Sequence, residues 1–163
     1  MNAEIDALVA GLANALRRAG LKMATAESCT GGLIAAACTT ISGSSDWFER
    51  GFVTYSNEAK TEMLGVTPAL IVAHGAVSEP VARAMAEGAI ARSHAQLGVA
   101  VTGVAGPGGG SPSKPVGTVW LAWVRAGEAT RAELLQLHGD RRAIREQTVQ
   151  HALRRLLDSA SAG

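Results

Sequence analysis

The sequence predicts a single three-layer α/β/α domain with a mixed sheet, spanning residues 1–163. Three observations lead to this fold class. Segments with apolar residues at three- and four-residue steps alternate with short apolar runs, and Gly- or Pro-containing turns separate them. Helices and strands in alternation pack as helices on both faces of one sheet. The length of 163 residues suits one core, and neither a linker nor an internal repeat divides it.

The first half of the chain shows the helical period most clearly at its start, where Ile5, Val9, Leu12 and Leu16 form one stripe and Gly20 suits a C-terminal cap. Ser56 is placed to cap a later helix that Gly65 closes. The expected elements are a helix at 2–19, a strand at 22–26, a helix at 33–40, a loop at 43–46, a strand at 47–55, a helix at 57–64 and a helical turn at 68–73.

The second half opens on a long helix, because Ser78 is a capping residue and the acidic Glu79 and Pro80 suit a first turn. Asp140 is placed to cap the last helix. The expected elements are a helix from 78 to about 96, a buried strand at 99–104, a glycine-rich loop at 106–115, strands at 116–124 and 130–137 forming an antiparallel hairpin, a helix from 140 to about 157, and a frayed tail at about 159–163.

Composition and charge exclude several classes of protein. The net charge of +1 is far below that of a general nucleic-acid binder, and the 4% aromatic content argues against stacking of single strands. Two cysteines form neither a disulfide framework nor a zinc site. No apolar run is long enough to span a membrane, and acidic residues stand where a signal peptide would be basic. We expect a cytoplasmic protein without nucleic-acid or membrane partners.

The turn at residues 27–32, Glu-Ser-Cys-Thr-Gly-Gly, follows a strand and precedes a helix, which is where active sites lie in α/β folds. Ser28 could act there as a nucleophile, with backbone N–H groups of Thr30, Gly31 and Gly32 holding an oxyanion. Local signals alone favour a plainer role, in which Ser28 or Thr30 is only a helix cap. The turn lacks the Gly-x-Ser-x-Gly pattern of α/β-hydrolases.

Lys60 lies in the first turns of a predicted helix, where the helix dipole disfavours its positive charge. A serine nucleophile needs a base, and a neutral lysine can serve. The dipole supplies only about 1 kcal/mol, so burial must provide most of the lowering of the pKa. Without other evidence, a solvated surface lysine is the commoner interpretation.

A third turn, from Thr102 through Gly103 and Gly106 to residue 110, is neither a Walker A loop nor a Rossmann fingerprint. Its free N–H groups suit an anion-binding nest, and a flexible surface loop is an equal alternative. Arg141 and Arg145 lie one turn apart on the last helix and could clamp a phosphate or carboxylate.

The remaining cysteine and histidine residues give weaker signals. Cys29 is a rival nucleophile, but no histidine lies near it in sequence to activate it, and Cys38 is expected in the core. The four histidines show no spacing that would hold a metal. We therefore expect neither a metal nor another cofactor.

These segments resemble the C-terminal domain of the CinA (competence/damage-inducible protein) family, which also occurs as a stand-alone nicotinamide-nucleotide amidohydrolase. The resemblance covers nearly the whole chain, in order. The matching blocks are Thr25–Gly32, Gly43–Ser45 with Trp47-Phe48, Gly51–Lys60, His74–Ser78, Thr102–Pro107, Lys114–Val119 and Gly139–Arg141.

The resemblance implies metal-free hydrolysis of the carboxamide of nicotinamide mononucleotide, giving nicotinate mononucleotide and ammonia, in pyridine nucleotide salvage. Carried onto this sequence, it makes Ser28 the nucleophile and Lys60 the general base. Tyr55 is the candidate for relaying or orienting the proton. The turn at Thr102–Gly106 is assigned, with Arg141 and Arg145, to the ribose and phosphate.

Two other functions stay open at this point. The family name also suggests a non-enzymatic nucleotide-sensing or partner-binding module in competence or the DNA damage response. A related amide, such as free nicotinamide or a dinucleotide, is a further alternative substrate. The apolar helices favour a homodimer.

Overall fold

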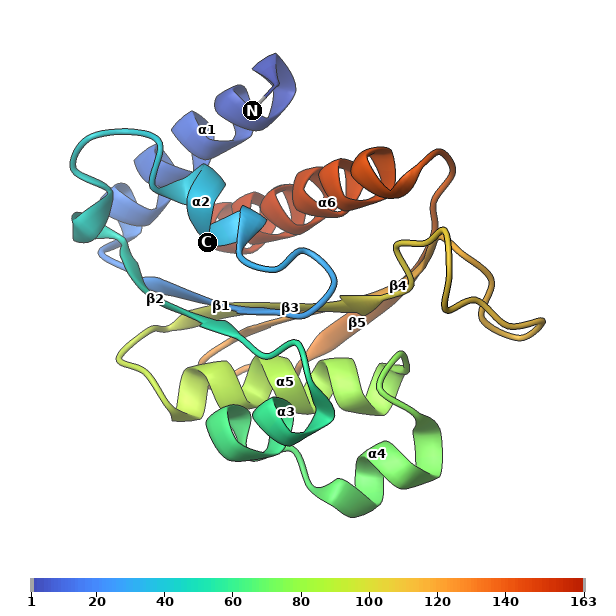
Figure 1. Ribbon diagram of the computed structural model, residues 1–163. Coiled ribbons are helices and arrows are strands. Elements are labelled where there is room, and N and C mark those ends of the chain that lie inside the picture. Colours follow the sequence, from blue (N-terminus) through green and yellow to red (C-terminus); the bar gives the residue numbers. More distant parts are fainter. Residues whose placement is uncertain (1, 163) are drawn as a thin grey trace.

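The computed structural model describes residues 2–162, which form a five-stranded sheet between two layers of helices (Figure 1). The first three strands in the sheet run parallel, and the last two are antiparallel to their neighbours. The predicted three-layer α/β/α class with a mixed sheet is therefore confirmed. The strands, in order across the sheet, are β2 (Phe48–Val53), β1 (Met23–Glu27), β3 (Leu97–Gly103), β4 (Thr118–Arg125) and β5 (Arg131–Gln136).

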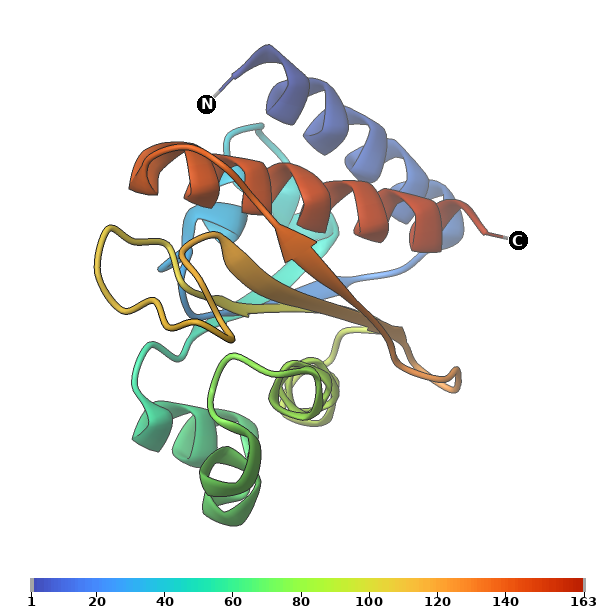
Figure 2. The same cartoon turned by 90° about the vertical axis from the view of Figure 1, so that its right-hand side faces the viewer.

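Helices lie on both sides of the sheet (Figures 1 and 2). On one face lie α1 (Ala3–Ala19), α2 (Leu33–Cys38) and α6 (Arg141–Ser161), and on the other lie α3 (Asn57–Leu64), α4 (Pro68–His74) and α5 (Glu79–Ala91). A short 3-10 helix, η1 (Ser44–Asp46), precedes β2. Each layer buries its own apolar cluster against the sheet, and the removal of this surface from water is the main force that joins the layers.

The local helix signals are confirmed where they depend on neighbours in sequence. Ser56 accepts a hydrogen bond from the Ala59 amide at 3.0 Å, and Asp140 accepts one from Ala143 at 2.8 Å. Gly20 ends α1 with a left-handed backbone (φ 68°), which a residue without a Cβ adopts at little cost.

The expectation that the helix opened by Ser78 continues to about residue 96 is wrong, because α5 ends at Ala91. The following residues find partners outside the helix. Arg92 donates to the carbonyls of Glu62 and Met63, and the Ser93 hydroxyl accepts from the Ala95 amide. Ser78 stands at the N-cap position without capping, since its hydroxyl donates to the Gly75 carbonyl at 2.7 Å.

The last helix is longer than expected, because α6 continues to Ser161 although the sequence predicts a frayed tail from about residue 159. The Arg125 guanidinium of β4 donates to the carbonyls of Ser159 (3.2 Å) and Ala162 (3.0 Å). This contact holds the end of the helix against the sheet. Residue 163, the last of the predicted tail, lies outside the described residues.

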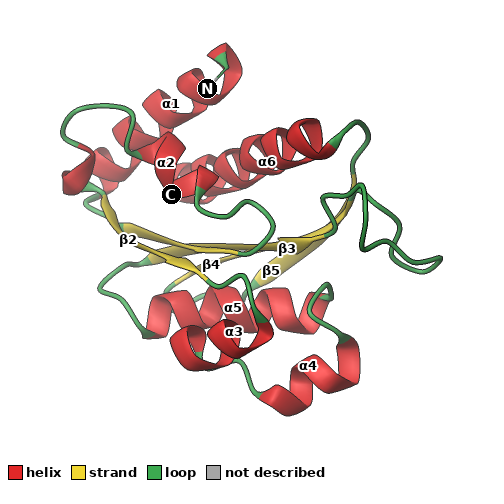
Figure 3. Ribbon diagram, in the orientation of Figure 1, coloured by secondary structure: helices red, strands yellow, loops and turns green. Residues whose placement is uncertain are grey.

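The order of the strands determines where a site can form. β1 pairs with β2 on one side and with β3 on the other, both parallel to it, so that their carboxyl ends lie at one edge of the sheet (Figure 3). The chain thus crosses to opposite sides of β1, and in open α/β sheets ligands bind in the crevice at such a point. Three segments begin at this edge: the predicted turns that follow Glu27 and Thr102, and the segment after β2 that contains Tyr55.

Within residues 2–162, no helix combines the length and the apolar character that crossing a bilayer requires. The same part of the chain holds no group of three His, Cys, Asp or Glu side chains placed to share a metal ion.

Candidate active site

Ser28 is the first residue after β1 and is held by the sheet itself. Its amide donates to the Val101 carbonyl of β3 at 3.1 Å, and its own carbonyl accepts from the Gly31 amide at 3.0 Å, which closes a tight turn. Gly31 and Gly32 follow with positive φ angles of 58° and 108°, a region that side chains with a Cβ rarely adopt. The two glycines therefore let the chain reverse directly behind the Ser28 hydroxyl.

Glu27 anchors this turn, a role that sequence analysis missed. Its side chain is fully buried and accepts three hydrogen bonds, from the Thr30 hydroxyl (2.6 Å) and from the amides of Ile34 (2.9 Å) and Ala35 (3.0 Å). Neither Ser28 nor Thr30 caps α2, so the plainer interpretation of this turn is wrong. An acidic residue at the end of a strand of Met, Ala and Thr was the available signal, since a buried carboxylate needs such partners.

Lys60 is buried, with only 1% of its surface exposed, so the interpretation as a solvated surface lysine is wrong. Its Nζ lies 3.1 Å from the Ser28 Oγ, 3.0 Å from the Thr54 carbonyl and 3.3 Å from the Tyr55 carbonyl. No carboxylate within residues 2–162 comes within ion-pair distance of this amine, and Glu58 is exposed. Burial therefore lowers the pKa of Lys60.

The three contacts of Lys60 match a neutral amine as well as a charged one. A neutral amine has two N–H groups and one lone pair, and the two carbonyls of Thr54 and Tyr55 can accept both hydrogens. The lone pair is then free to accept the Ser28 O–H. This arrangement can deprotonate the hydroxyl, whereas an ammonium at the same place can only donate to it.

Cys29 is not equipped to compete with Ser28. Its side chain is buried, and burial raises the pKa of the thiol to about 12. Because the thiolate is the nucleophile, a thiol with so high a pKa is inert at neutral pH.

A cavity of about 310 Å³ opens over the Ser28 hydroxyl and the Lys60 amine at the crevice between β1, β2 and β3. It brings together seven of the predicted site residues, and Asn57, Ala76 and Val77 join them although sequence analysis did not single them out. The predicted residues that line it are Ser28, Tyr55, Lys60, Thr102, Gly103, Gly106 and Arg141. Thr30, Gly31, Gly32 and Arg145 do not line it.

The two arginines predicted to form one clamp point to different places. Arg141 lies at the mouth of the cavity, where it donates to the Gly106 carbonyl (2.8 Å) and to the Tyr55 hydroxyl (3.2 Å). Arg145 lies behind the turn and donates to the carbonyls of Cys29 (3.1 Å) and Thr30 (3.2 Å). Arg145 therefore braces the backbone next to Ser28, and the expectation that it contacts a substrate phosphate together with Arg141 is not supported.

The hydroxyls of Tyr55 and Thr102 are already engaged. The Tyr55 hydroxyl accepts a hydrogen bond from Arg141, and in the described chain it forms no hydrogen bond with Ser28 or Lys60. Thr102 is buried and donates to the Ala76 carbonyl at 3.0 Å, which fixes the segment before α5 against β3.

The free amides near Ser28 agree only in part with those expected. The Gly31 amide is occupied by the Ser28 carbonyl, whereas the amides of Cys29, Thr30 and Gly32 have no acceptor among residues 2–162. Of these three residues, Cys29 lines the cavity and follows the candidate nucleophile directly in the chain.

Comparison with known proteins places this chain in a family. The model of the CinA C-terminal domain matches residues 5–160. The chain belongs to the CinA C-terminal domain family. The resemblance seen in the sequence motifs is thereby confirmed over nearly the whole chain.

Among the relatives in this family, the "nicotinamide-nucleotide amidohydrolase PncC" of Pseudomonas putida is 56% identical over 155 residues, which cover 94% of this chain and 95% of the relative. A "CinA-like protein" of Akkermansia muciniphila is 57% identical over 144 residues. That match covers 88% of this chain but 35% of the relative, so the chain spans about a third of the length of such longer members.

A solved structure in the family shows the same fold. The crystal structure of the competence/damage inducible protein CihA from Agrobacterium tumefaciens has a TM-score of 0.95 and 46% sequence identity. The match covers 97% of this chain and 96% of that one.

Proposed function

We propose that this chain hydrolyses the carboxamide of nicotinamide mononucleotide to nicotinate mononucleotide and ammonia, with Ser28 as nucleophile and Lys60 as general base. The observation that carries the proposal is the 3.1 Å contact between the Ser28 Oγ and a buried Lys60 amine without a carboxylate partner in the described chain. Relatives in Pseudomonas putida and Escherichia coli, matched over 95% and 94% of their length, bear the name of this activity.

In the first half of the reaction, neutral Lys60 takes the Ser28 proton as the Oγ forms a bond to the carboxamide carbon. The carbonyl oxygen becomes an oxyanion, and we assign the free amide of Cys29, a residue that lines the cavity, to donate to it. One such donor contributes about 3 kcal/mol to stabilising a transition state of this kind. The amides first expected in this role belong to Thr30, Gly31 and Gly32, which do not line the cavity, so the assignment moves to Cys29.

The nitrogen of the substrate carboxamide then leaves as ammonia. The Lys60 ammonium returns its proton to that nitrogen as the C–N bond breaks, which leaves an ester between Ser28 and the nicotinate carbonyl. A water molecule gives a proton to Lys60 and attacks the ester, and Ser28 regains the proton when the C–O bond to it breaks. One amide and one water are consumed, and one carboxylic acid and one ammonia are formed.

The rest of the nucleotide is assigned to the mouth of the cavity. Arg141 lies there without a carboxylate partner among residues 2–162, and the loop from Thr102 to Gly106 supplies backbone groups beside it. We assign the 5′-phosphate to Arg141, because guanidinium groups match phosphate geometry. Tyr55 is assigned to the wall of this subsite rather than to proton relay, since its hydroxyl accepts a hydrogen bond from Arg141.

Ammonia release from nicotinamide mononucleotide tests the proposal. Ser28→Ala and Lys60→Ala should each abolish turnover in a folded protein, and the double variant should be hardly worse than either, because the pair acts as a unit. Lys22→Ala, which removes an exposed lysine, is the matched control and should stay active. Full activity in either dyad variant would refute the mechanism.

The same assay separates the other two functions. Binding of the nucleotide without turnover by the intact chain would favour a sensing module. Equal turnover of nicotinamide mononucleotide and of nicotinamide riboside, which lacks the phosphate, would overturn the assignment of Arg141 to the phosphate.

A further inference from the structure

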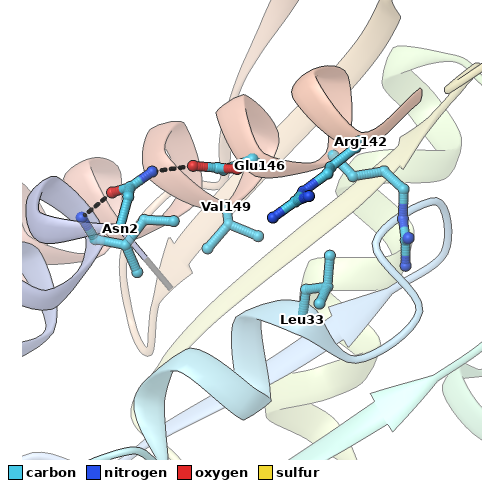
Figure 4. Close-up of a pocket in the computed structure, with 7 residues that line it drawn as sticks. Asn2, Leu33, Arg142, Glu146 and Val149 are labelled. Carbon is cyan, nitrogen blue, oxygen red and sulfur yellow. Dashed lines mark hydrogen bonds between the residues drawn. The ribbon is translucent and has the colours of Figure 1, made fainter. Parts of the chain in front are cut away.

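A second cavity lies on the opposite side of the Ser28 turn, between α1, α2 and α6. At about 560 Å³ it is larger than the cavity over Ser28 and Lys60, and the two share no lining residue. Figure 4 shows Leu33 of α2 rising toward Val149 and Arg142 of α6. The residues that line it are Asn2, Ile5, Leu33, Arg142, Arg145, Glu146 and Val149.

The charges in this cavity favour an anion. Arg142 and Arg145 have no carboxylate within ion-pair distance among residues 2–162. The one acidic group, Glu146, accepts a hydrogen bond from the side-chain amide of Asn2, whose Oδ1 in turn caps α1 by accepting from the Ile5 amide at 2.8 Å (Figure 4). Two guanidinium groups against one carboxylate leave a net positive charge.

The donors of the two arginines are largely unused. The Arg145 guanidinium uses two of its five N–H groups on the carbonyls of Cys29 and Thr30, and the Arg142 side chain makes no hydrogen bond in the described chain. Three apolar residues also line the cavity: Leu33 of α2 is half-buried, and Ile5 of α1 and Val149 of α6 are buried beneath the surface. A cavity of this size is within the range of pockets that hold small molecules.

We propose that this cavity binds a small organic anion, with its acidic group on Arg142 and Arg145 and its apolar body against Leu33. The acidic group can be a carboxylate or a phosphate, because guanidinium groups bind both in the same forked manner. The apolar residues offer no hydrogen-bond partner to a strongly hydrated inorganic ion. An anion with an apolar body is therefore favoured over an inorganic anion.

An occupant there reaches the Ser28 turn through Arg145, and this second step rests on the proposed function. The Arg145 guanidinium touches the cavity and also holds the two carbonyls whose peptide units carry the amides of Thr30 and Gly31. An anion bound to the same guanidinium alters the hydrogen bonds that Arg145 donates to the carbonyls of Cys29 and Thr30, beside the nucleophile. Binding at this cavity is therefore expected to change the turnover number without competing with the substrate.

Calorimetric titration with benzoate, and with benzyl alcohol as the uncharged analogue, tests the site. The intact protein should bind benzoate more tightly than benzyl alcohol. Arg142→Gln should weaken benzoate binding about tenfold, because it removes a charged hydrogen-bonding partner. Leu33→Trp should fill the cavity and abolish binding, with thermal melts to confirm folding. Arg18→Gln, an exposed arginine at the far end of α1, is the matched control and should bind normally.

Three results would overturn the site. Two are the absence of saturable benzoate binding and equally tight binding of benzyl alcohol. The third is loss of benzoate binding in Arg141→Gln rather than in Arg142→Gln, which would place benzoate at the cavity over Ser28. None of these depends on amidase activity. For the second step, saturating benzoate should change the turnover of nicotinamide mononucleotide in the intact protein and not in Arg142→Gln. Bound benzoate that leaves turnover unchanged would refute the coupling and leave the binding site standing.

Discussion

Replacing Glu27 with glutamine tests how the Ser28 turn is held in place. In the folded protein, Oε1 of Glu27 accepts from the Thr30 hydroxyl and the Ile34 amide, and Oε2 accepts from the Ala35 amide. Glutamine keeps one acceptor oxygen and brings an NH₂ group against the Ala35 N–H. One charged hydrogen bond is lost, and two donors face each other in a buried place.

The expected loss follows from these contacts. A hydrogen bond to a charged group contributes about 1.5–3 kcal/mol, and a buried unsatisfied donor costs about 1–3 kcal/mol. Relief from burying a charge offsets part of this. We expect Glu27→Gln to lower the free energy of unfolding by about 3 kcal/mol, and Glu27→Ala, which removes all three bonds, by more. Thr30→Val removes one bond and should cost about 1.5 kcal/mol.

Denaturant unfolding of the three variants, followed by circular dichroism, measures these differences. Glu58→Gln is the matched control, since this glutamate is exposed on α3 and should change stability by less than about 0.5 kcal/mol. If Glu27→Gln were as stable as the parent, or if Thr30→Val were the most damaging change, the carboxylate would not be the anchor of the turn and the reasoning would be refuted.

Further predictions concern the cavity over Ser28. Because burial lowers the pKa of Lys60 below its usual 10.5, the unfolded chain binds the extra proton between the two values, and the free energy of unfolding should rise with pH across that window. Lys60→Met should remove this rise in pH-dependent denaturant melts, and an unchanged slope would contradict the pKa shift. Turnover should increase with pH through the lowered pKa of Lys60, since only the neutral amine accepts the Ser28 proton; a rate that falls over this range would count against Lys60 as the base. Tyr55→Phe should raise the KM for nicotinamide mononucleotide and leave kcat within about threefold, because its hydroxyl meets Arg141; a loss of kcat of a hundredfold or more, the usual effect of removing a proton-transfer group, would restore the relay role.

Signals that act over a few residues were readable from the sequence. The caps at Ser56 and Asp140 join atoms three residues apart, and the left-handed ends at Gly20 and Gly65 need only the absence of a Cβ. The alternation of helices and strands was enough for the fold class, because apolar periodicity decides which face of each element is buried. The family resemblance was likewise present in the order of the motifs.

What the tertiary structure alone decided are the contacts between segments far apart in the chain. Thirty-two positions separate Lys60 from Ser28, and their 3.1 Å contact exists because β1 and β2 run parallel and end at the same edge of the sheet. Arg141 and Arg145 share a helix face in sequence, yet Arg141 donates to the Tyr55 hydroxyl and Arg145 donates to the Cys29 carbonyl in the Ser28 turn. They differ because different loops cover successive turns of α6. Local periodicity carries no information about which partner a side chain meets across the sheet, and this is the part of the site that packing determines.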